Sequence, residues 1–253
     1  MKKAVFNWSG GKDSSLSLYR LLKTKEYDIK YLLTSVNSQF QRISMHGVRI
    51  ALLEEQAKSI GIPLYQLMIP EMPSMEIYDQ MMAETLRKFK DEGIDYSIYG
   101  DIFLEDLKKY REEQLAKVDM KGVFPIWKES TSQLIRDFID SGFKAVLVCV
   151  NEKYLDKSFA GRLIDKNFLK ALPKNVDPCG ENGEYHSFVY NGPIFKRPIK
   201  FIKGKVVYRN YKPLKNAPAS HKDGLSCPSL QDVDTGFWYC DLIPHSRLQK
   251  PSR

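Results

Sequence analysis

The chain has 253 residues, of which 43% are hydrophobic and 28% charged, and this length can bury the core of one large or two small domains. It has no apolar run near the roughly 18 residues of a membrane span and no basic leader before an apolar segment, so we expect a cytoplasmic protein. The four cysteines lie far apart and form no C-x-x-C pair, so we expect free thiols and no disulfides.

Short apolar runs alternate with longer amphipathic ones over residues 1–150, the first predicted domain. We expect strands at Ala4–Asn7, Tyr31–Val36, Leu64–Ile69, Tyr96–Tyr99, Val123–Trp127 and Ala145–Val150. Helices are expected at about Ser14–Thr24, Val48–Ile60, Met75–Glu92, Glu105–Asp119 and Thr131–Ser141. This alternation predicts an α/β fold, a doubly wound and mostly parallel sheet with helices on both faces. Ligands of such sheets bind beyond the carboxyl ends of the strands, so the residues after each strand are the candidates for function.

A smaller α+β domain is predicted over residues 151–215, where a stretch with a helical pattern, Asn151 to Pro173, precedes an apolar strand. The remaining residues, 216–253, are predicted to form a basic tail that need not be ordered. From Phe195 onward 12 lysines and arginines face 4 aspartates and no glutamate, whereas the first 194 residues carry 27 charges of each sign. Such a tail could contact RNA, a ribosome or an acidic protein, but a solvated surface that improves solubility explains the charge equally well.

The turn after the first strand carries the densest group of candidate binding residues. Gly10 and Gly11 can adopt positive φ and have no Cβ to keep a ligand from the backbone, and Lys12 adds a positive charge at neutral pH. A helix begins directly after them, so unpaired amides and the positive end of the helix dipole point to the same place. Hydroxyl donors are available from Ser9, Ser14 and Ser15. The turn therefore predicts a phosphate-binding site.

Asp13 lies in the same turn but cannot bind a phosphate directly. It is either the N-cap of the helix or a ligand of a Mg²⁺ ion that bridges phosphates. Because Gly11-Lys12 is followed by Asp and no glycine stands five residues before Gly11, the turn is not a Walker A loop. No G-x-G-x-x-G is present either, which argues against a dinucleotide-binding fold.

Polar residues also follow the second and fourth predicted strands. The backbone at Ser35 is a candidate for hydrogen bonds to adenine, and His46-Gly47 lies where a ribose or second phosphate contact would fall, although a plain helix start would also explain that pair. Gly100-Asp101 would bring the backbone close to a ligand and place a carboxylate over it, for Mg²⁺ or for substrate. A turn with an aspartate N-cap is the alternative for this pair.

A second polar motif lies between Asp177 and Tyr190, ahead of an apolar strand. It combines two carboxylates, an amide and an imidazole with a glycine between them, namely Glu181, Asn182, Gly183, Glu184 and His186. Asn-Gly alone is typical of a hairpin turn, which is the structural alternative. The density of polar groups instead indicates a site that binds an acceptor or nucleophile near the nucleotide.

Ser9 to Ser14 resemble the SGGxDS signature of the PP-loop ATP pyrophosphatases. Together with Met45-His46-Gly47, Gly100-Asp101 and the motif from Gly180 to His186, they resemble the diphthine–ammonia ligase family of N-type ATP pyrophosphatases. The resemblance implies a PP-loop fold in which ATP, with Mg²⁺, is cleaved between its α and β phosphates. It further implies that ammonium amidates the carboxylate of diphthine, a modified histidine on translation elongation factor 2.

From these observations together we expect catalytic roles for Lys12, Asp13, Asp101, Glu181, Glu184 and His186. Nucleotide contacts are expected from Ser9, Gly10, Gly11, Lys12, Asp13, Ser14, Ser15, Ser35, His46, Gly47, Gly100, Asn182 and Gly183, and Mg²⁺ contacts from Asp13 and Asp101. The alternatives are amidation of a different carboxylate, an RNA-modifying PP-loop enzyme, or a nucleotide-binding sensor without turnover. The basic tail is expected to tune partner binding, so a truncation near Ala219 should leave nucleotide binding intact.

Overall fold

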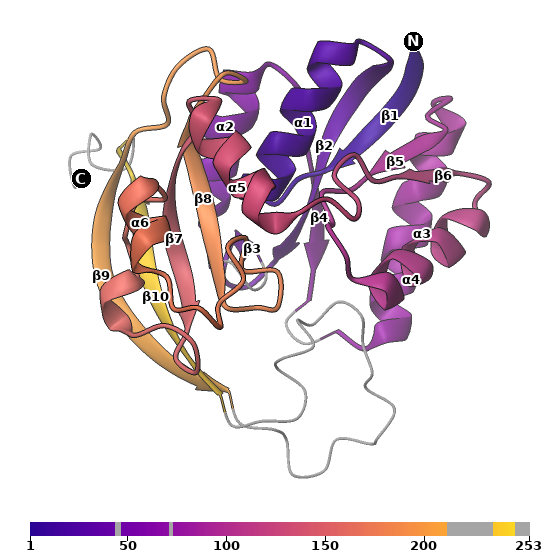
Figure 1. Ribbon diagram of the computed structural model, residues 1–253. Coiled ribbons are helices and arrows are strands. Elements are labelled where there is room, and N and C mark those ends of the chain that lie inside the picture. The colour runs from indigo at the N-terminus through magenta and orange to yellow at the C-terminus, as the bar shows by residue number, and fades with distance from the viewer. Residues whose placement is uncertain (44–46, 71–72, 212–234, 246–253) are drawn as a thin grey trace.

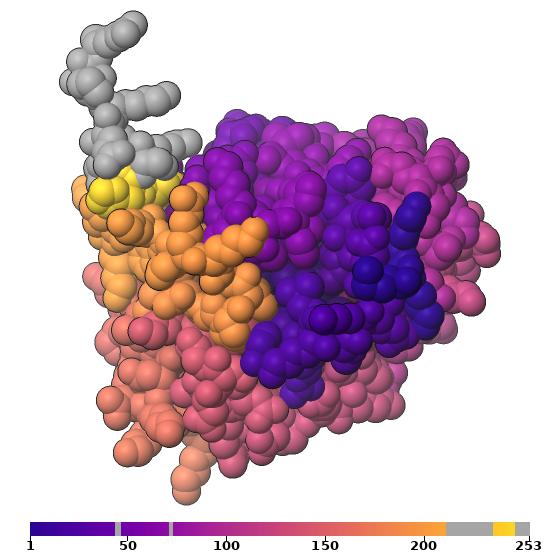
Figure 2. Space-filling model, turned by 90° about the horizontal axis from the view of Figure 1, so that it is seen from above, coloured from indigo at the N-terminus to yellow at the C-terminus, as the bar shows by residue number. Residues whose placement is uncertain are grey.

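The computed structural model describes residues 1–43, 47–70, 73–211 and 235–245, and it contains two β-sheets with helices packed around them (Figure 1). Seen from above, the orange residues of the second sheet abut the indigo and violet residues of the first half of the chain (Figure 2). Within these ranges, none of the helices combines the length and the apolar character needed to cross a membrane.

Five parallel strands form most of the first sheet, in the order β4-β2-β1-β5-β6. Their bounds are β1 Lys2–Asn7, β2 Tyr27–Asn37, β4 Leu64–Ile69, β5 Tyr96–Ile98 and β6 Lys121–Val123. A short strand, β3 (Arg42–Ile43), pairs antiparallel with the end of β2. The predicted α/β fold with a mostly parallel sheet is therefore confirmed.

Helices cover both faces of this sheet (Figure 1). One face carries α1 (Lys12–Thr24), α2 (Ile50–Ile60) and α5 (Thr131–Asp140), and the other carries α3 (Met75–Asp91) and α4 (Glu105–Ala116). Successive residues of a strand point to opposite faces, so Phe6 of β1 packs in the first apolar cluster and Val5 in the second. In a strand that is covered on both faces, apolar residues need not alternate with polar ones. This explains the unbroken apolar run of β1.

The second sheet is antiparallel, in the order β8-β7-β10-β9. Its strands are β7 Lys144–Asn151, β8 Tyr185–Asn191, β9 Phe201–Tyr211 and β10 Thr235–Pro244. A short 3-10 helix, η1 (Lys157–Phe159), and α6 (Lys166–Ala171) pack Phe159 and Phe168 against it. One continuous cluster of buried side chains joins this sheet to α1, α2 and α5.

Three expectations drawn from the sequence need correction. The strand predicted at 145–150 forms, but as β7 it pairs antiparallel in the second sheet and not in the parallel one. A buried apolar run does not reveal which sheet it joins, because both environments favour the same residues. The helical pattern at 151–173 gives only η1 and α6, and the strand predicted at 123–127 ends at Val123. The division of the chain at residues 150 and 215 stays a prediction.

The predicted tail also needs correction, because part of it is a central strand. Residues 235–244 form β10, which lies between β7 and β9. A truncation near Ala219 would remove this strand, so the expectation that such a chain keeps its nucleotide site does not follow from the fold. Of the rest of the predicted tail, His245 is described, and residues 216–234 and 246–253 lie outside the described residues.

Asp241 of β10 ties the second sheet to the segment that precedes α2. Its carboxylate lies 3.0 Å from Nη2 of Arg42 and 2.7 Å from Nη2 of Arg49. Burial favours the neutral acid, but the two guanidinium groups prevail and lower the pKa of Asp241. Nearby, the ring of Tyr239 lies 3.1 Å from the point where a Cβ on Gly47 would stand. The C-terminal strand therefore supports residues that the sequence assigns to the nucleotide site.

We predict that Asp241→Ala lowers the unfolding free energy by about 1–3 kcal/mol, because it leaves two partly buried guanidinium groups without their carboxylate. Thermal unfolding measures this loss, and a fall of several degrees is expected for a chain of this size. The matched control is Glu26→Ala, which removes an exposed ion pair with Lys2 and should change the melting temperature little. Equal changes in melting temperature for the two substitutions would show that the ion pairs of Asp241 do not stabilise the fold.

Candidate active site

The turn between β1 and α1 has the backbone conformation that close approach of a ligand requires. Gly10 has a φ of +73°, in the left-handed region that favours glycine. Gly11 is the N-cap of α1 and provides no side-chain cap for the amides that follow. The hydroxyls of Ser9 and Ser14 lie 3.0 Å apart, and Ser14 also donates to the Gly11 carbonyl at 3.0 Å. These hydrogen bonds stabilise the conformation of the turn.

Gly100, at the end of β5, is in contact with the start of α1. A Cβ added there would stand 3.0 Å from the backbone nitrogen of Ser14 and 3.2 Å from the carbonyl carbon of Asp13. Because those neighbours are backbone atoms, they cannot adopt another rotamer to make room. A larger residue at position 100 would therefore displace the start of α1. The close approach sets the next residue, Asp101, beside the turn.

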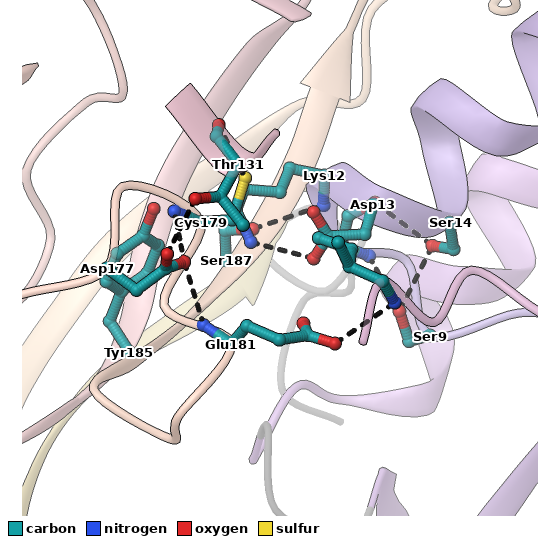
Figure 3. A network of polar contacts seen from close by, with 12 residues as sticks. Ser9, Lys12, Asp13, Ser14, Thr131, Asp177, Cys179, Glu181, Tyr185 and Ser187 are labelled. Carbon is teal, nitrogen blue, oxygen red and sulfur yellow. Dashed lines mark hydrogen bonds and ion pairs between the residues drawn. The ribbon is translucent and has the colours of Figure 1, made fainter. Parts of the chain in front are cut away.

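Lys12 is buried, and its ammonium group lies between the turn and the second sheet (Figure 3). Nζ is 2.7 Å from Oδ2 of Asp13 and 5.1 Å from the centre of the Tyr185 ring. Burial opposes the charge, but the Asp13 carboxylate more than offsets this effect and raises the pKa of Lys12. The side chain therefore stays charged and brings positive potential to the junction of the two sheets.

The strand β8 is hydrogen-bonded directly to the turn. The amide of Val189 donates to the Gly10 carbonyl at 2.9 Å, and the amide of Lys12 donates to Oγ of Ser187 at 3.2 Å. The end of the first sheet and the start of β8 are thus fixed relative to each other. The polar motif predicted from the sequence immediately precedes this strand.

Two carboxylates of the polar motif are used to shape its loop, residues 177–184. Glu184 is 1% exposed and accepts hydrogen bonds from the amides of Asp177 and Asn182, each at 2.9 Å. Asp177 accepts from the Cys179 amide at 2.8 Å and from the Thr131 hydroxyl at 2.7 Å. These contacts leave Glu181 as the carboxylate of the loop that extends toward the turn (Figure 3).

Glu181 accepts a hydrogen bond from the Ile102 amide at 3.1 Å, which bridges the loop to the segment after β5. Burial, followed by the negative charge of Asp13, raises the pKa of Glu181 to about 8. Burial also raises the pKa of Asp13 and of Asp101. Three carboxyl groups from three segments thus converge near the start of α1.

Asp101 is held by an arginine from α4. Nη1 of Arg111 lies 2.8 Å from Oδ2 of Asp101, and the guanidinium lies 4.2 Å from the centre of the Tyr99 ring. Burial raises the pKa of Asp101, and the neighbouring Arg111 charge only partly counteracts it. The arginine therefore fixes the direction of this carboxylate and favours its charged form.

Asp13 and Asp101 fit the chemistry of a Mg²⁺ ion that arrives with a nucleotide. Such an ion takes one or two carboxylates and completes its shell with phosphate oxygens and waters. Burial and the negative charge of Asp13 both raise the pKa of Asp101, so a cation between the two carboxylates would relieve their repulsion. Among the described residues, no group of three or more His, Cys, Asp and Glu side chains forms a complete metal site.

Comparison with known families decides where the chain belongs. Residues 1–122 match the diphthamide synthase N-terminal domain, and residues 130–216 match the diphthamide synthase C-terminal domain. The chain belongs to the diphthamide synthase family. The family resemblance inferred from the turn and the polar motif is thereby confirmed.

Curated members of this family are similar at modest identity. Human diphthine–ammonia ligase is 25% identical over 183 residues, which are 66% of this chain and 67% of that protein. The mouse protein is 25% identical over 63% of this chain and 64% of its own length, and the fission yeast protein is 29% identical over 41% and 18%. The match therefore spans about two thirds of the human and mouse proteins.

A solved structure, the U34-tRNA thiolase NcsA from Methanococcus maripaludis with its [4Fe-4S] cluster, is 16% identical over 55% of this chain and 56% of that chain. The TM-score of the two chains is 0.33.

In this diphthamide synthase family member, the predicted residues do not all meet at one point. Those that do are Ser9, Gly10, Gly11, Lys12, Asp13, Ser14, Gly100, Asp101 and Glu181. Ser15 is fully buried, and its hydroxyl has no hydrogen-bond partner among the described residues. It therefore lies on the buried face of α1. Ser35 is half-buried in β2 beside Tyr78.

The remaining predicted residues lie around this centre. Gly47 has a φ of +65° and packs on Tyr239, whereas His46 lies outside the described residues. Asn182 and Gly183 lie in the loop, where the Asn182 side chain donates to Glu184 at 3.2 Å. His186 is half-buried on β8, opposite Cys149 of β7. The catalytic and binding roles of all these residues stay predictions.

Five residues that shape the site are not among the site residues expected from the sequence, namely Gln56, Arg111, Asp177, Tyr185 and Ser187. The position of Gln56 in the pattern of α2 is a signal that the sequence itself contains. Gln56 lies three residues after Leu53 and beside Ala57, on the apolar face of α2, where a polar side chain needs a buried partner. Asp177, Tyr185 and Ser187 lie within the polar motif between Asp177 and Tyr190, and Arg111 lies on the charged helix α4, but their contacts with Thr131, Lys12 and Asp101 are not visible in the sequence pattern.

The raised pKa of Glu181 predicts how stability depends on pH. This carboxyl has a pKa of about 8 in the folded protein against an ordinary value of 4.5, so the folded state holds the proton more tightly. Stability should therefore fall as pH rises through this window, and Asp13 and Asp101 act in the same direction. We predict that Glu181→Gln flattens this fall.

Thermal unfolding between about pH 5 and 8 measures the effect in both proteins. The control is Glu113→Gln on the exposed side of α4, which should leave the pH profile unchanged. A Glu181→Gln profile identical to that of the wild type would show that the carboxyl titrates normally.

Proposed function

We propose that the chain is an ATP-dependent carboxylate–ammonia ligase that splits ATP into AMP and pyrophosphate. The observation that carries the proposal is the meeting of an amide-lined helix start, the buried Lys12 and the carboxyl of Glu181 at the junction of the two sheets. The relatives named diphthine–ammonia ligase support an amidation. The acceptor would then be diphthine on elongation factor 2 or a related protein.

The turn is suited to hold the departing pyrophosphate. The helix dipole favours negative charge at the start of α1, and Gly10 lets the phosphate approach the backbone. Lys12 adds a full positive charge where charge develops on the leaving group. Bound Mg²⁺, held by Asp13 and Asp101, would supply further neutralisation of the phosphates.

In the proposed reaction an oxygen of the acceptor carboxylate attacks the α-phosphorus of ATP, and the bond from this phosphorus to the bridging oxygen breaks. Pyrophosphate leaves, and the acyl-adenylate remains. The nitrogen of ammonia then attacks the acyl carbon, AMP departs with the bond electrons, and the amide forms. Ammonium must lose a proton before it attacks, and Glu181, with a pKa of about 8, can accept one near neutral pH.

The two other residues expected on the acceptor side differ in their surroundings. His186 is half-buried on β8 and stays a candidate for orienting the acceptor. Glu184 gives both carboxylate oxygens to hydrogen bonds within the loop, so we propose for it a supporting role and not a direct one.

An RNA-modifying PP-loop enzyme is the second candidate, favoured by the basic residues of β9. Lys203, Lys205 and Arg209 are exposed on this edge strand. A sulfur-transferring enzyme of this type would be expected to use paired cysteines near the site. Cys149, Cys179 and Cys240 are buried, and the sequence holds no C-x-x-C pair, which favours amidation.

We predict that ATP is converted to AMP and pyrophosphate when an acceptor and ammonium are present. Nucleotide chromatography and a pyrophosphate assay measure the products. Lys12→Met should lower kcat/KM by about 10²- to 10³-fold, because it removes positive charge from the leaving group. Lys109→Met, on the exposed side of α4, is the control and should retain full activity. Formation of ADP and phosphate would contradict the proposal.

The binding of RNA, expected from the basic end of the chain, gives a separate prediction. A variant with Lys203, Lys205 and Arg209 all changed to Gln should bind a single-stranded RNA oligonucleotide more weakly at low salt. The slope of log affinity against log salt should become shallower by about 0.7 for each phosphate that the variant no longer neutralises. Fluorescence anisotropy over a salt series measures both the affinity and the slope. If the variant had the wild-type slope, these residues would not neutralise RNA phosphates, and their charge would serve solubility alone.

A further inference from the structure

The side chain of Gln56 joins three segments that are distant in the sequence. It is fully buried on α2, and its Oε1 accepts a hydrogen bond from Nε1 of Trp8 at 2.9 Å. Its Nε2 donates to the Gly10 carbonyl at 3.1 Å and to the Val189 carbonyl at 2.6 Å. Both amide protons and the amide oxygen are therefore in use.

These partners allow only one orientation of the amide. The Trp8 indole can only donate, and the two carbonyl oxygens can only accept, so an exchange of the amide oxygen and nitrogen would break all three contacts. The fit is also tight, because a Cβ on Gly10 would stand 2.7 Å from Oε1 of Gln56. The side chain thus holds the turn at a fixed distance from α2 and β8.

The link continues from the turn to the acidic loop through β8. The Val189 amide donates to the same Gly10 carbonyl, and Ser187 accepts from the Lys12 amide. β8 begins at Tyr185, directly after loop 177–184 and its Glu181. Four residues of one strand therefore separate the Gln56 contact at Val189 from the end of that loop.

We propose that Gln56 is a positioning residue that couples nucleotide binding at the turn to the placement of the acidic loop. The inference rests on the proposed function in one respect, namely that ATP is the ligand of the turn. Two carbonyl oxygens, from Gly10 and Val189, converge on one amide and would repel each other without it. A ligand that orders Gly10 therefore also orders β8, and the acidic loop is set when the nucleotide is bound.

A residue that merely fills the core would behave differently. Its substitution would lower the melting temperature but would leave the response of β8 to a ligand unchanged. Gln56→Glu separates the two roles, because it keeps the volume and an oxygen for Trp8, whereas it offers the two carbonyls no donor when ionised and only one when protonated. Gln80→Glu is the matched control, on the exposed side of α3.

Hydrogen exchange with and without a non-hydrolysable ATP analogue tests the coupling in the full chain. In the wild type the analogue should slow exchange in the turn, 9–15, and in residues 177–191, each by about tenfold relative to α4. In Gln56→Glu the turn should keep its protection, while the effect on 177–191 should fall to about twofold or less. The Gln80→Glu control should match the wild type.

The outcomes separate this inference from the proposed function. Protection of the turn without protection of 177–191 in the wild type would overturn the coupling alone. Equal protection of 177–191 in wild type and Gln56→Glu would do the same, whatever the melting temperature. A wild-type protein whose turn is not protected does not bind ATP there, and both proposals fall. If Gln56→Glu does not fold, Gln56→Met, which lacks both donors, replaces it with the same expected result.

Discussion

The structure depends on the close approach of two backbones at the turn after β1. The Gly10 carbonyl accepts from the Val189 amide, and a Cβ on Gly100 would collide with the backbone of Ser14. Glycine at both points lets the end of one sheet, the start of α1 and the strand of a second sheet meet within hydrogen-bond distance. The helix start therefore lies in a region from which much of the water is excluded, where its dipole and its amides act strongly on a charged ligand.

The same burial explains the electrostatics of the site. Asp13, Asp101 and Glu181 come from three segments, and burial raises the pKa of each. Holding acids together in this way costs stability, and folds tolerate such a cost at sites that a ligand will complete. Lys12 and Arg111 each fix one of these carboxylates, so the acids keep defined directions while their charges stay only partly compensated.

Much of the fold could be predicted because it follows local patterns. The alternation of apolar runs predicted the parallel sheet, and the turn at Gly10-Gly11-Lys12 lies, as expected, between its first strand and α1, while its role in binding stays a prediction. The limits have physical reasons too. The apolar run of β7 is compatible with either sheet, and the basic composition after Phe195 concealed the strand β10. Gln56 contacts Gly10, and Asp177 contacts Thr131, each across 46 residues, and no short segment encodes these tertiary contacts.

The position of β10 has a consequence for how the protein is made. It is the last strand of the described chain, yet it lies between β7 and β9, and its register joins Tyr239 to Cys149. During synthesis the second sheet lacks one of its central strands until residues 235–244 have left the ribosome. Contacts of such long sequence separation form slowly, and exposed strand edges invite wrong partners in the meantime. A nascent chain would thus contain a complete parallel sheet beside an incomplete antiparallel one, and the junction between the two sheets would be among the last parts to form.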